Sequence, residues 1–527
     1  MRSIAILLAG LVIAPGKAQP QPRSASLVNI STTTHNHPGG GAAANRADSL
    51  PRRSSYDIPF QPDQTVVTEH EVTIRGQRVP YRATAGMQPV WDTEGRVQAG
   101  VFFTYYERSD VKDRGPRPLL ISFNGGPGTS SLWMELGYTG PRIVHIDDEG
   151  YPLQPYGLKD NPHSVLDVAD IVFVDPVNTG YSRAVSRDIP TTRFFGVNAD
   201  IKYLAEWINT FVTRMSRWAS PKYLIGESYG TGRVSGLALE LQQSHWMFVN
   251  GVILVSPTTL GIERDGPLAS ALKLPYMAAT AWYHQALPAD LQAKDLTEVL
   301  PEVEAFTVDE LVPALSKGGF LDPGKRRAVA ARMARYSGIS EKAVLQNNLD
   351  LPLSFFWKEL LRDKGYTVGR LDSRYKGIDR RDAGDQPDFN AELISWEHSF
   401  TPAINIYLRD ELKYKTDLKY YVFGPVQPWD RTNDRTGENL RLAMAQNPYL
   451  HVLIQSGYYD GACDYFNAKY SMWQLDPSGK LKDRLSWEGY RSGHMMYLRR
   501  PDLEASNESL RKFIQRTVPA AGRPAKY

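Results

Sequence analysis

The chain has 527 residues, of which 42% are hydrophobic, 11% aromatic and 23% charged, and its formal net charge is +3. These values are typical of a globular protein, and no basic stripe points to a nucleic-acid partner. A single cysteine, Cys463, excludes an intramolecular disulfide, so the packed core must supply the stability.

The amino terminus is typical of a signal peptide. A charged start, Met1-Arg2-Ser3, precedes a short apolar run to Ala14, and small residues close the pattern at Ala18. The apolar run is too short to span a membrane as a helix. We predict a signal peptide over 1–18, export to the periplasm or the outside of the cell, and no stable membrane insertion after cleavage. An uncleaved membrane-surface anchor is the alternative.

The segment 19–57 is polar and rich in small residues, which predicts a disordered leader. Residues 66–106 then alternate between apolar and polar side chains, which predicts an antiparallel meander. A later segment repeats apolar residues every three or four positions up to Met215, which predicts an amphipathic helix capped by Asn198 or Asp200.

Short, continuous apolar runs follow the meander and alternate with helical patterns. Such runs suit strands that are covered on both faces. The predicted strands are 119–123, 171–174, 223–226, 252–255, 452–454 and 485–490. The alternation predicts an α/β protein with a doubly wound, mostly parallel sheet.

Strand runs disappear between about 258 and 400, where helical spacing takes over, as in Ala328–Tyr336 and Leu353–Arg362. This stretch is far longer than a βαβ crossover requires. We therefore predict a helical insertion, or cap, that lies over the carboxyl ends of the strands and shapes a substrate pocket. The core is predicted to comprise 58–257 and 401–520.

The segment Gly226-Glu227-Ser228-Tyr229-Gly230 joins a predicted strand to a predicted helix. In that context Gly-x-Ser-x-Gly is typical of a nucleophile elbow, a turn so tight that the positions two before and two after the serine must lack bulk. A serine hydroxyl needs a base, and the base needs an orienting acid. His494 lies in a late loop and Asp460 follows a strand and a glycine turn. Their order along the chain is that of α/β hydrolases.

Both partners have structural alternatives: Asp460 could be an Asx-turn residue, and His494 a packed loop histidine. A further requirement is a set of donors for the oxyanion. The loop Asn124-Gly125-Gly126-Pro127-Gly128 follows a core strand, and its N–H groups can meet that of Tyr229. A plain Gly-Pro loop is the alternative. No metal-ligand spacing is found, so no metal or cofactor is expected.

These blocks together resemble the serine carboxypeptidases, over about residues 120 to 500. The resemblance is weak in the helical insertion and absent from the leader. The blocks that carry it are 124–132, 140–141, 170–182, 226–230, 460–463 and 493–495. The resemblance implies an α/β-hydrolase fold with Ser228 as the nucleophile, His494 as the general base and acid, and Asp460 as its orienting partner.

The same resemblance implies roles for residues around the nucleophile. Gly126 and Tyr229 would offer the oxyanion N–H groups. Asn124, Gly125 and Glu227 would bind the terminal carboxylate of the substrate. Cys463 matches a family cysteine near the acid, and simple packing is the alternative role for it.

Two departures from the family pattern affect this expectation. Thr129 stands where the family usually has a disulfide-bonded cysteine, and Tyr138 where it usually has a glutamate that pairs with the one beside the nucleophile. The two-carboxyl arrangement is then reduced to Glu227, unless Glu135 substitutes. Because like charges in a buried site cannot both ionise cheaply, we predict that Glu227 binds the carboxylate through a proton that it keeps.

The sequence thus predicts a serine carboxypeptidase that acts through an acyl-enzyme on peptides with a free C-terminus. An esterase or acyltransferase of the same fold is the alternative, and a catalytically inactive binding module is a third interpretation. The side-chain preference, the pH optimum and the oligomeric state stay open.

Overall fold

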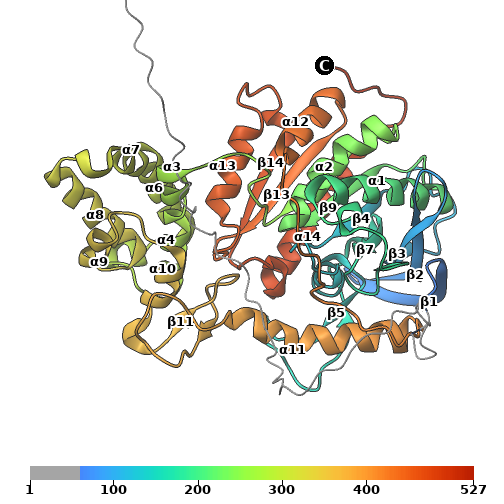
Figure 1. Cartoon of the computed structure of the whole chain (residues 1–527), viewed down its shortest axis with the longest axis horizontal. Coiled ribbons are helices and arrows are strands. Elements are labelled where there is room, and N and C mark those ends of the chain that lie inside the picture. Colours follow the sequence, from blue (N-terminus) through green and yellow to red (C-terminus); the bar gives the residue numbers. More distant parts are fainter. Residues whose placement is uncertain (1–57, 59) are drawn as a thin grey trace, which may run out of the picture. The chain divides into compact units, whose positions relative to one another are not determined.

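A ten-stranded sheet organises the chain (Figure 1). The computed structural model describes residue 58 and residues 60–527. The strand order is β1-β2-β3-β7-β4-β9-β10-β13-β14, and β8 pairs with β3. The signal peptide and the leader predicted over 1–57 lie outside the described residues, so they and the export inferred from them stay predictions.

The first three strands form the predicted antiparallel meander. They are β1 (Gln64–Ile74), β2 (Gln77–Trp91) and β3 (Val97–Arg108), and each is antiparallel to the next. The last strand of the meander, β3, also pairs antiparallel with β7 and with the short β8 (Arg183–Ala184). The meander thus extends one side of the central sheet.

The other strands run parallel to one another. They are β4 (Leu119–Phe123), β7 (Asp170–Val174), β9 (Lys222–Glu227), β10 (Gly251–Val255), β13 (His451–Gly457) and β14 (Leu485–Tyr490). Every residue of β4, β7, β9 and β10 is buried. Continuous apolar runs are therefore covered on both faces, as the sequence predicted.

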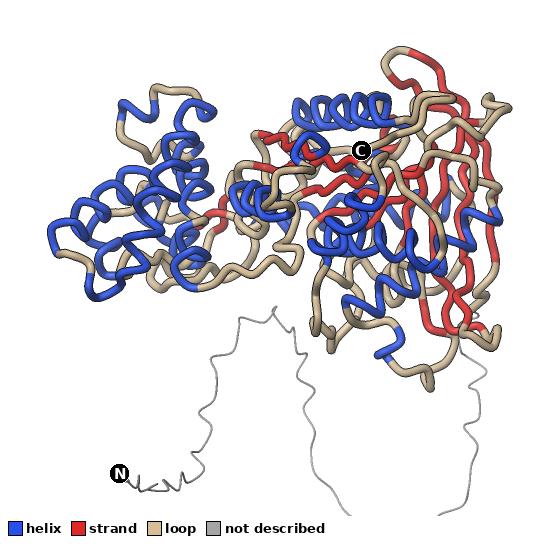
Figure 2. Tube along the Cα trace, turned by 90° about the horizontal axis from the view of Figure 1, so that it is seen from above, coloured by secondary structure: helices blue, strands red, loops and turns tan. Residues whose placement is uncertain are grey.

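Helices lie on both faces of the sheet (Figure 2). Each face has its own hydrophobic core. One core includes α1 (Val197–Arg214), α2 (Tyr229–Ser244), α12 (Thr436–Gln446) and α13 (Tyr465–Leu475). The other includes α11 (Ala391–Ile406) and α14 (Arg500–Thr517). This is the doubly wound arrangement that the sequence predicted.

The capping prediction for α1 is wrong. The helix begins at Val197 after Gly196, so Asn198 and Asp200 both lie inside it. Asp200 is fully buried and accepts a hydrogen bond of 2.7 Å from Arg233 Nε of α2. Its carboxylate therefore joins two helices by a buried ion pair, which local sequence signals cannot distinguish from a cap.

Short helices fill most of the region between β10 and α11. They are α3 (Gly266–Ala271), α4 (Leu274–Tyr283), α5 (Ala289–Gln292), α6 (Leu296–Phe306), α7 (Val312–Lys317), α8 (Pro323–Ser337), α9 (Glu341–Gln346) and α10 (Leu353–Glu359). Most of them share a hydrophobic core of their own. The two-residue strands β11 (Thr367–Val368) and β12 (Lys376–Gly377) pair here, although no strand was predicted. The proposed domain boundaries stay a prediction.

This helical region is joined to the loop after β13 through Ser373. The Ser373 amide donates to Tyr459 O at 2.9 Å. Its hydroxyl and carbonyl lie 2.7 Å from Thr280 Oγ1 and 2.6 Å from His284 Nε2. Helix α4 is thereby held at the carboxyl ends of the strands. No helix within the described part of the chain is long and apolar enough to cross a membrane.

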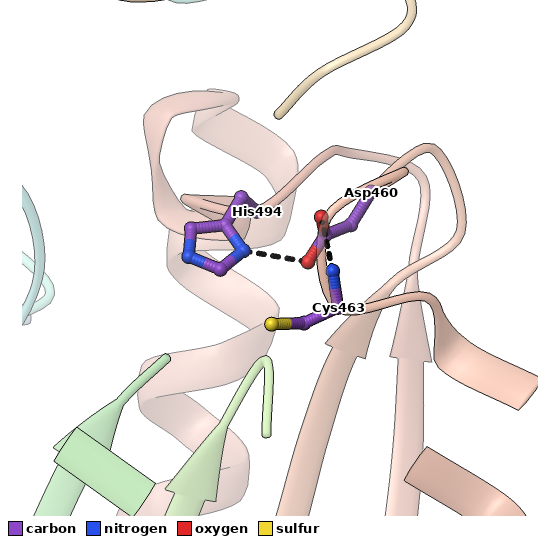
Figure 3. A group of neighbouring side chains, drawn as sticks. All are labelled: Asp460, Cys463 and His494. Carbon is purple, nitrogen blue, oxygen red and sulfur yellow. Dashed lines mark hydrogen bonds and ion pairs between the residues drawn. The ribbon is translucent and has the colours of Figure 1, made fainter. Parts of the chain in front are cut away.

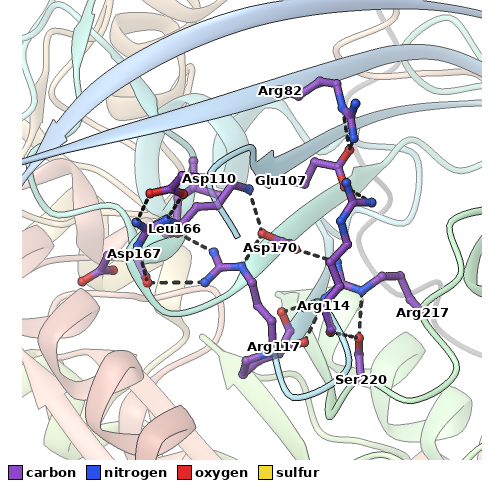
Figure 4. A network of polar contacts seen from close by, with 12 residues as sticks. Arg82, Glu107, Asp110, Arg114, Arg117, Leu166, Asp167, Asp170, Arg217 and Ser220 are labelled. Carbon is purple, nitrogen blue, oxygen red and sulfur yellow. Dashed lines mark hydrogen bonds and ion pairs between the residues drawn. The ribbon is translucent and has the colours of Figure 1, made fainter. Parts of the chain in front are cut away.

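A buried ionic network lies at the amino end of β7 (Figure 4). Asp170, the first residue of β7, accepts hydrogen bonds from Arg117 Nε at 2.7 Å and Arg217 Nη1 at 2.6 Å. The Arg108 amide donates to the same carboxylate at 3.0 Å. Because removal of one partner would leave the others charged and buried, this network is sensitive to single substitutions.

Candidate active site

Ser228 sits on a strained turn between β9 and α2. Its φ of 57° and ψ of −126° lie in a region that residues other than glycine rarely adopt. A Cβ at Gly226 would lie 2.1 Å from Gly230 O, and one at Gly230 would lie 2.9 Å from Asn124 O. The close approach of these backbones explains why both flanking positions lack side chains, as a nucleophile elbow requires.

His494 and Asp460 lie in the loops that follow the last two strands of the sheet. His494 Nδ1 is 2.7 Å from Asp460 Oδ2 (Figure 3). The other carboxylate oxygen accepts from the amides of Ala462 at 2.8 Å and Cys463 at 3.0 Å. Because the carboxylate accepts, Nδ1 carries the hydrogen, which leaves Nε2 of the neutral ring free to act as a base.

The charges around His494 favour its protonated form. Burial lowers the pKa of His494, but the charge and the hydrogen bond of Asp460, with the charge of Glu227, outweigh burial and raise it. An imidazolium formed by proton transfer would therefore be stabilised.

The backbones of Ser228 and His494 are both tied to the end of β10. The Ser228 amide donates to Val255 O at 3.0 Å, and the Ser256 hydroxyl donates to His494 O at 2.7 Å. Cys463 is close to these groups: the Ser228 side chain lowers the pKa of its thiol against the larger effect of burial, and its Sγ lies within 4.8 Å of side-chain ligand atoms of His494 and Asp460. The structure thus brings the three predicted catalytic residues to one place.

Asp460, Cys463 and His494 are spaced closely enough to hold a metal ion. Their chemistry does not favour one. The carboxylate and His494 Nδ1 are bonded to each other, and burial raises the pKa of the Cys463 thiol well above its usual value, with the charge of Asp460 adding to the effect. A neutral thiol is a poor ligand, so the group fits a hydrogen-bonded cluster better than a metal centre.

The glycine loop after β4 passes against the elbow. A Cβ at Gly125 would lie 2.5 Å from the amide nitrogen of Tyr229, and Gly126 has a φ of 98° that favours glycine. Outside the helices, no hydrogen bond joins the amide of Gly126 or Tyr229 to another described residue. The two amides thus meet one requirement of the predicted oxyanion role, which is to have no other acceptor.

Glu227 is 1% exposed and shares one of its oxygens between two donors. Asn124 Nδ2 donates to Oε2, and so does the Tyr497 hydroxyl, at 2.9 Å. Burial raises the pKa of Glu227 to about 7, against the opposing effects of His494, Tyr497 and Asn124. The carboxyl group beside Ser228 is therefore neutral in acid and titrates near neutral pH.

Neither Tyr138 nor Glu135 forms a hydrogen bond with Glu227 in the described chain. The Tyr138 hydroxyl donates to Gln455 Oε1 at 2.8 Å. Glu135 accepts a hydrogen bond of 2.5 Å from the Tyr106 hydroxyl. Glu135 is therefore not placed to substitute for the second glutamate, and Glu227 stands as a single carboxyl group.

Sequence reasoning missed two residues near the site. Tyr497 lies only three positions after His494, so the loop that carries the base was itself a signal. The charge of Arg370 lowers the pKa of His494, and its carbonyl accepts a hydrogen bond of 2.9 Å from the Gly461 amide. Arg370 belongs to the region between β11 and β12, where no motif was recognised.

The topology and this geometry are those of the α/β-hydrolase fold. The elbow follows a central parallel strand, the acid and the histidine follow the last two strands, and an antiparallel meander precedes them.

The chain is similar to the serine carboxypeptidases over part of its length. The sequence model of that family matches residues 76–294. Serine carboxypeptidase-like 36 of Arabidopsis thaliana is 32% identical over 168 residues, which are 30% of this chain and 32% of that protein. Serine carboxypeptidase-like 11 of the same plant is 28% identical over 36% of this chain and 42% of its own length. The chain thus aligns with less than half the length of these relatives.

Among solved structures, a prohormone-processing carboxypeptidase of Saccharomyces cerevisiae aligns with 82% of this chain and 91% of its own. Its sequence identity is 14% and the TM-score is 0.48.

Proposed function

We propose that the protein is a serine-type carboxypeptidase that removes C-terminal residues from peptides. The observation that carries this proposal is the placement of a buried, titratable carboxyl group, Glu227, directly before a serine on a nucleophile elbow. The match of residues 76–294 to the sequence model of the serine carboxypeptidases supports it. We expect no metal or cofactor to take part.

In the first half-reaction, His494 Nε2 would accept the proton of the Ser228 hydroxyl as Oγ attacks the carbonyl carbon of the last peptide bond. The N–H groups of Gly126 and Tyr229 would stabilise the oxyanion. Collapse of the tetrahedral species would break the C–N bond, and His494 would give its proton to the leaving amine.

The acyl-enzyme left on Ser228 would then be hydrolysed. A water molecule would give a proton to His494 as it attacks the ester carbon. The proton would return to Ser228 Oγ as the shortened peptide leaves as an acid. Asp460 would keep its charge throughout and stabilise the imidazolium.

Recognition of the substrate's terminal carboxylate would fall to Asn124, Gly125 and Glu227. A neutral Glu227 can donate a hydrogen bond to an anion, whereas an ionised one repels it. Burial supports the neutral form up to about pH 7. The site would therefore select peptides with a free C-terminus in acidic and neutral solution.

Hydrolysis of an N-blocked dipeptide and of its C-terminal amide tests this proposal, with Ser228→Ala as the control. We expect the free acid to be hydrolysed much faster than the amide, and Ser228→Ala to be inactive on both. Equal rates on the acid and the amide would favour the esterase or acyltransferase alternative. Unchanged activity of Ser228→Ala would refute the nucleophile.

A further inference from the structure

The two oxygens of Glu227 have very different surroundings. Oε2 accepts hydrogen bonds from Asn124 Nδ2 and from the Tyr497 hydroxyl, the latter at 2.9 Å. Oε1 is buried and has no hydrogen-bond partner among the described residues. Buried polar atoms are nearly always paired, so the missing partner of Oε1 calls for an explanation.

We propose that Tyr497 positions Glu227 so that the proton of its neutral form sits on Oε1 and is donated from there to the terminal carboxylate of the substrate. This inference rests on the proposed function. It names Tyr497 as a positioning residue and Oε1 as the atom that recognises the anion.

The hydrogen-bond geometry assigns the proton to Oε1. A proton on Oε2 would be directed against two groups, the Tyr497 O–H and the Asn124 N–H, that already donate to that oxygen. A proton on Oε1 meets no such donor but lacks an acceptor. An oxygen of the substrate carboxylate would supply that acceptor through a charge-assisted hydrogen bond.

Tyr497 is itself held rigidly. Its ring stacks on that of Tyr138 with centroids 4.8 Å apart and an angle of 9° between the planes. It packs against Gly137, where a Cβ would lie 2.8 Å from Tyr497 Cε2. Tyr497 follows His494 by three residues. The same segment therefore carries the proposed base and the hydroxyl that orients Glu227.

The groups that face Glu227 give the direction in which its titration should move. Burial raises the pKa of Glu227, and the charge of Asp460 adds to this. His494, Tyr497 and Asn124 lower it. Loss of the Tyr497 hydroxyl therefore raises the pKa of Glu227 and also frees the carboxyl group to turn.

The test compares Tyr497→Phe with a matched variant, Tyr138→Phe. Each loses one buried phenol hydroxyl and keeps the ring, but the Tyr138 hydroxyl donates to Gln455 and not to Glu227. Initial rates on an N-blocked dipeptide and on its amide are measured from pH 5 to 9.

We expect Tyr497→Phe to raise KM for the free acid by about tenfold at pH 5 while kcat changes by less than about threefold. The pH above which kcat/KM falls should move upward by about one unit. Tyr138→Phe should resemble the wild type in both respects. In a Glu227→Gln background, Tyr497→Phe should no longer move the alkaline limit, because the titrating group is gone.

An unchanged KM and alkaline limit in Tyr497→Phe would overturn the inference, as would equal shifts in Tyr138→Phe. A shift that persists in the Glu227→Gln background would also overturn it, since Tyr497 would then act through another group. If the wild type hydrolyses the acid and the amide equally well, the proposed function itself fails, and the inference fails with it.

Discussion

Replacement of Glu227 by glutamine should extend peptide hydrolysis to higher pH. Burial raises the pKa of this carboxyl group to about 7, and only its neutral form can donate to a substrate carboxylate. Glutamine carries an N–H donor at every pH and never becomes charged. The variant should therefore keep its affinity for free C-termini where the wild type loses it.

The size of the effect follows from the titration. At one pH unit above the pKa, about a tenth of the Glu227 carboxyl groups remain neutral. The ratio of kcat/KM of Glu227→Gln to that of the wild type should therefore rise by about tenfold between pH 6 and pH 8. Titration of His494 affects both proteins, so the ratio removes most of its contribution. The charge of Glu227 raises the pKa of His494, so the acid limit of the variant should move slightly lower.

Initial rates on an N-blocked dipeptide acid, measured for both proteins at constant ionic strength, give this ratio. The C-terminal amide of the same dipeptide is the control, because it offers no carboxylate and its ratio should stay flat. A flat ratio for the free acid as well would refute the role of Glu227 as a proton-bearing donor.

Three further substitutions test the fold. Gly226→Ala should destroy the elbow and the activity, because the new Cβ would lie 2.1 Å from a backbone oxygen. Gly232→Ala is the control and should stay active, because the atom nearest to its new Cβ lies 3.5 Å away. Equal activities of the two variants would contradict this prediction. Asp170→Asn should lower the free energy of unfolding, measured by urea denaturation, by about 3–5 kcal/mol. The more exposed Asp110→Asn is the control and should lower it by less than about 1 kcal/mol. Equal losses in the two variants would contradict the role of the buried network. Burial raises the pKa of Glu135 to about 8 from 4.5, so its contribution to stability is complete below about pH 4.5 and is lost as the pH rises through 8. Over this range the Tm of Glu135→Gln should therefore fall less than the Tm of the wild type. Parallel curves of Tm against pH for the two proteins would contradict this assignment.

Much of the central fold could be predicted because its signals are local. Continuous apolar runs mark the buried parallel strands, and the alternating pattern marks the meander, whose bounds agree to within a few residues. The failures came from a tertiary contact and from very short strands. Asp200 has the chemistry of a helix cap, yet it pairs with Arg233 of another helix. The two-residue strands β11 and β12 are too short to leave a periodic pattern in the sequence.

In the site, too, local sequence signals predicted some residues, whereas residues that depend on tertiary contacts were missed. Ser228, Asp460 and His494 could be predicted to lie close together because each follows a strand and their order along the chain is characteristic. The partner of Glu227 could not be found by counting from a family pattern, which pointed to Tyr138 and Glu135. Tyr497 reaches Glu227 from a loop 270 residues further along the chain. Such contacts depend on the packing of the completed fold.

Labelling with a fluorophosphonate tests most directly whether Ser228 and His494 act together as the nucleophile and its base. Intact mass and peptide mapping should show one adduct per molecule, on Ser228, in the wild type. The same reagent should leave His494→Gln unmodified when its circular dichroism and Tm match the wild type. A folded wild type that stays unlabelled, or that carries its label on another serine, would contradict the assignment of the active site.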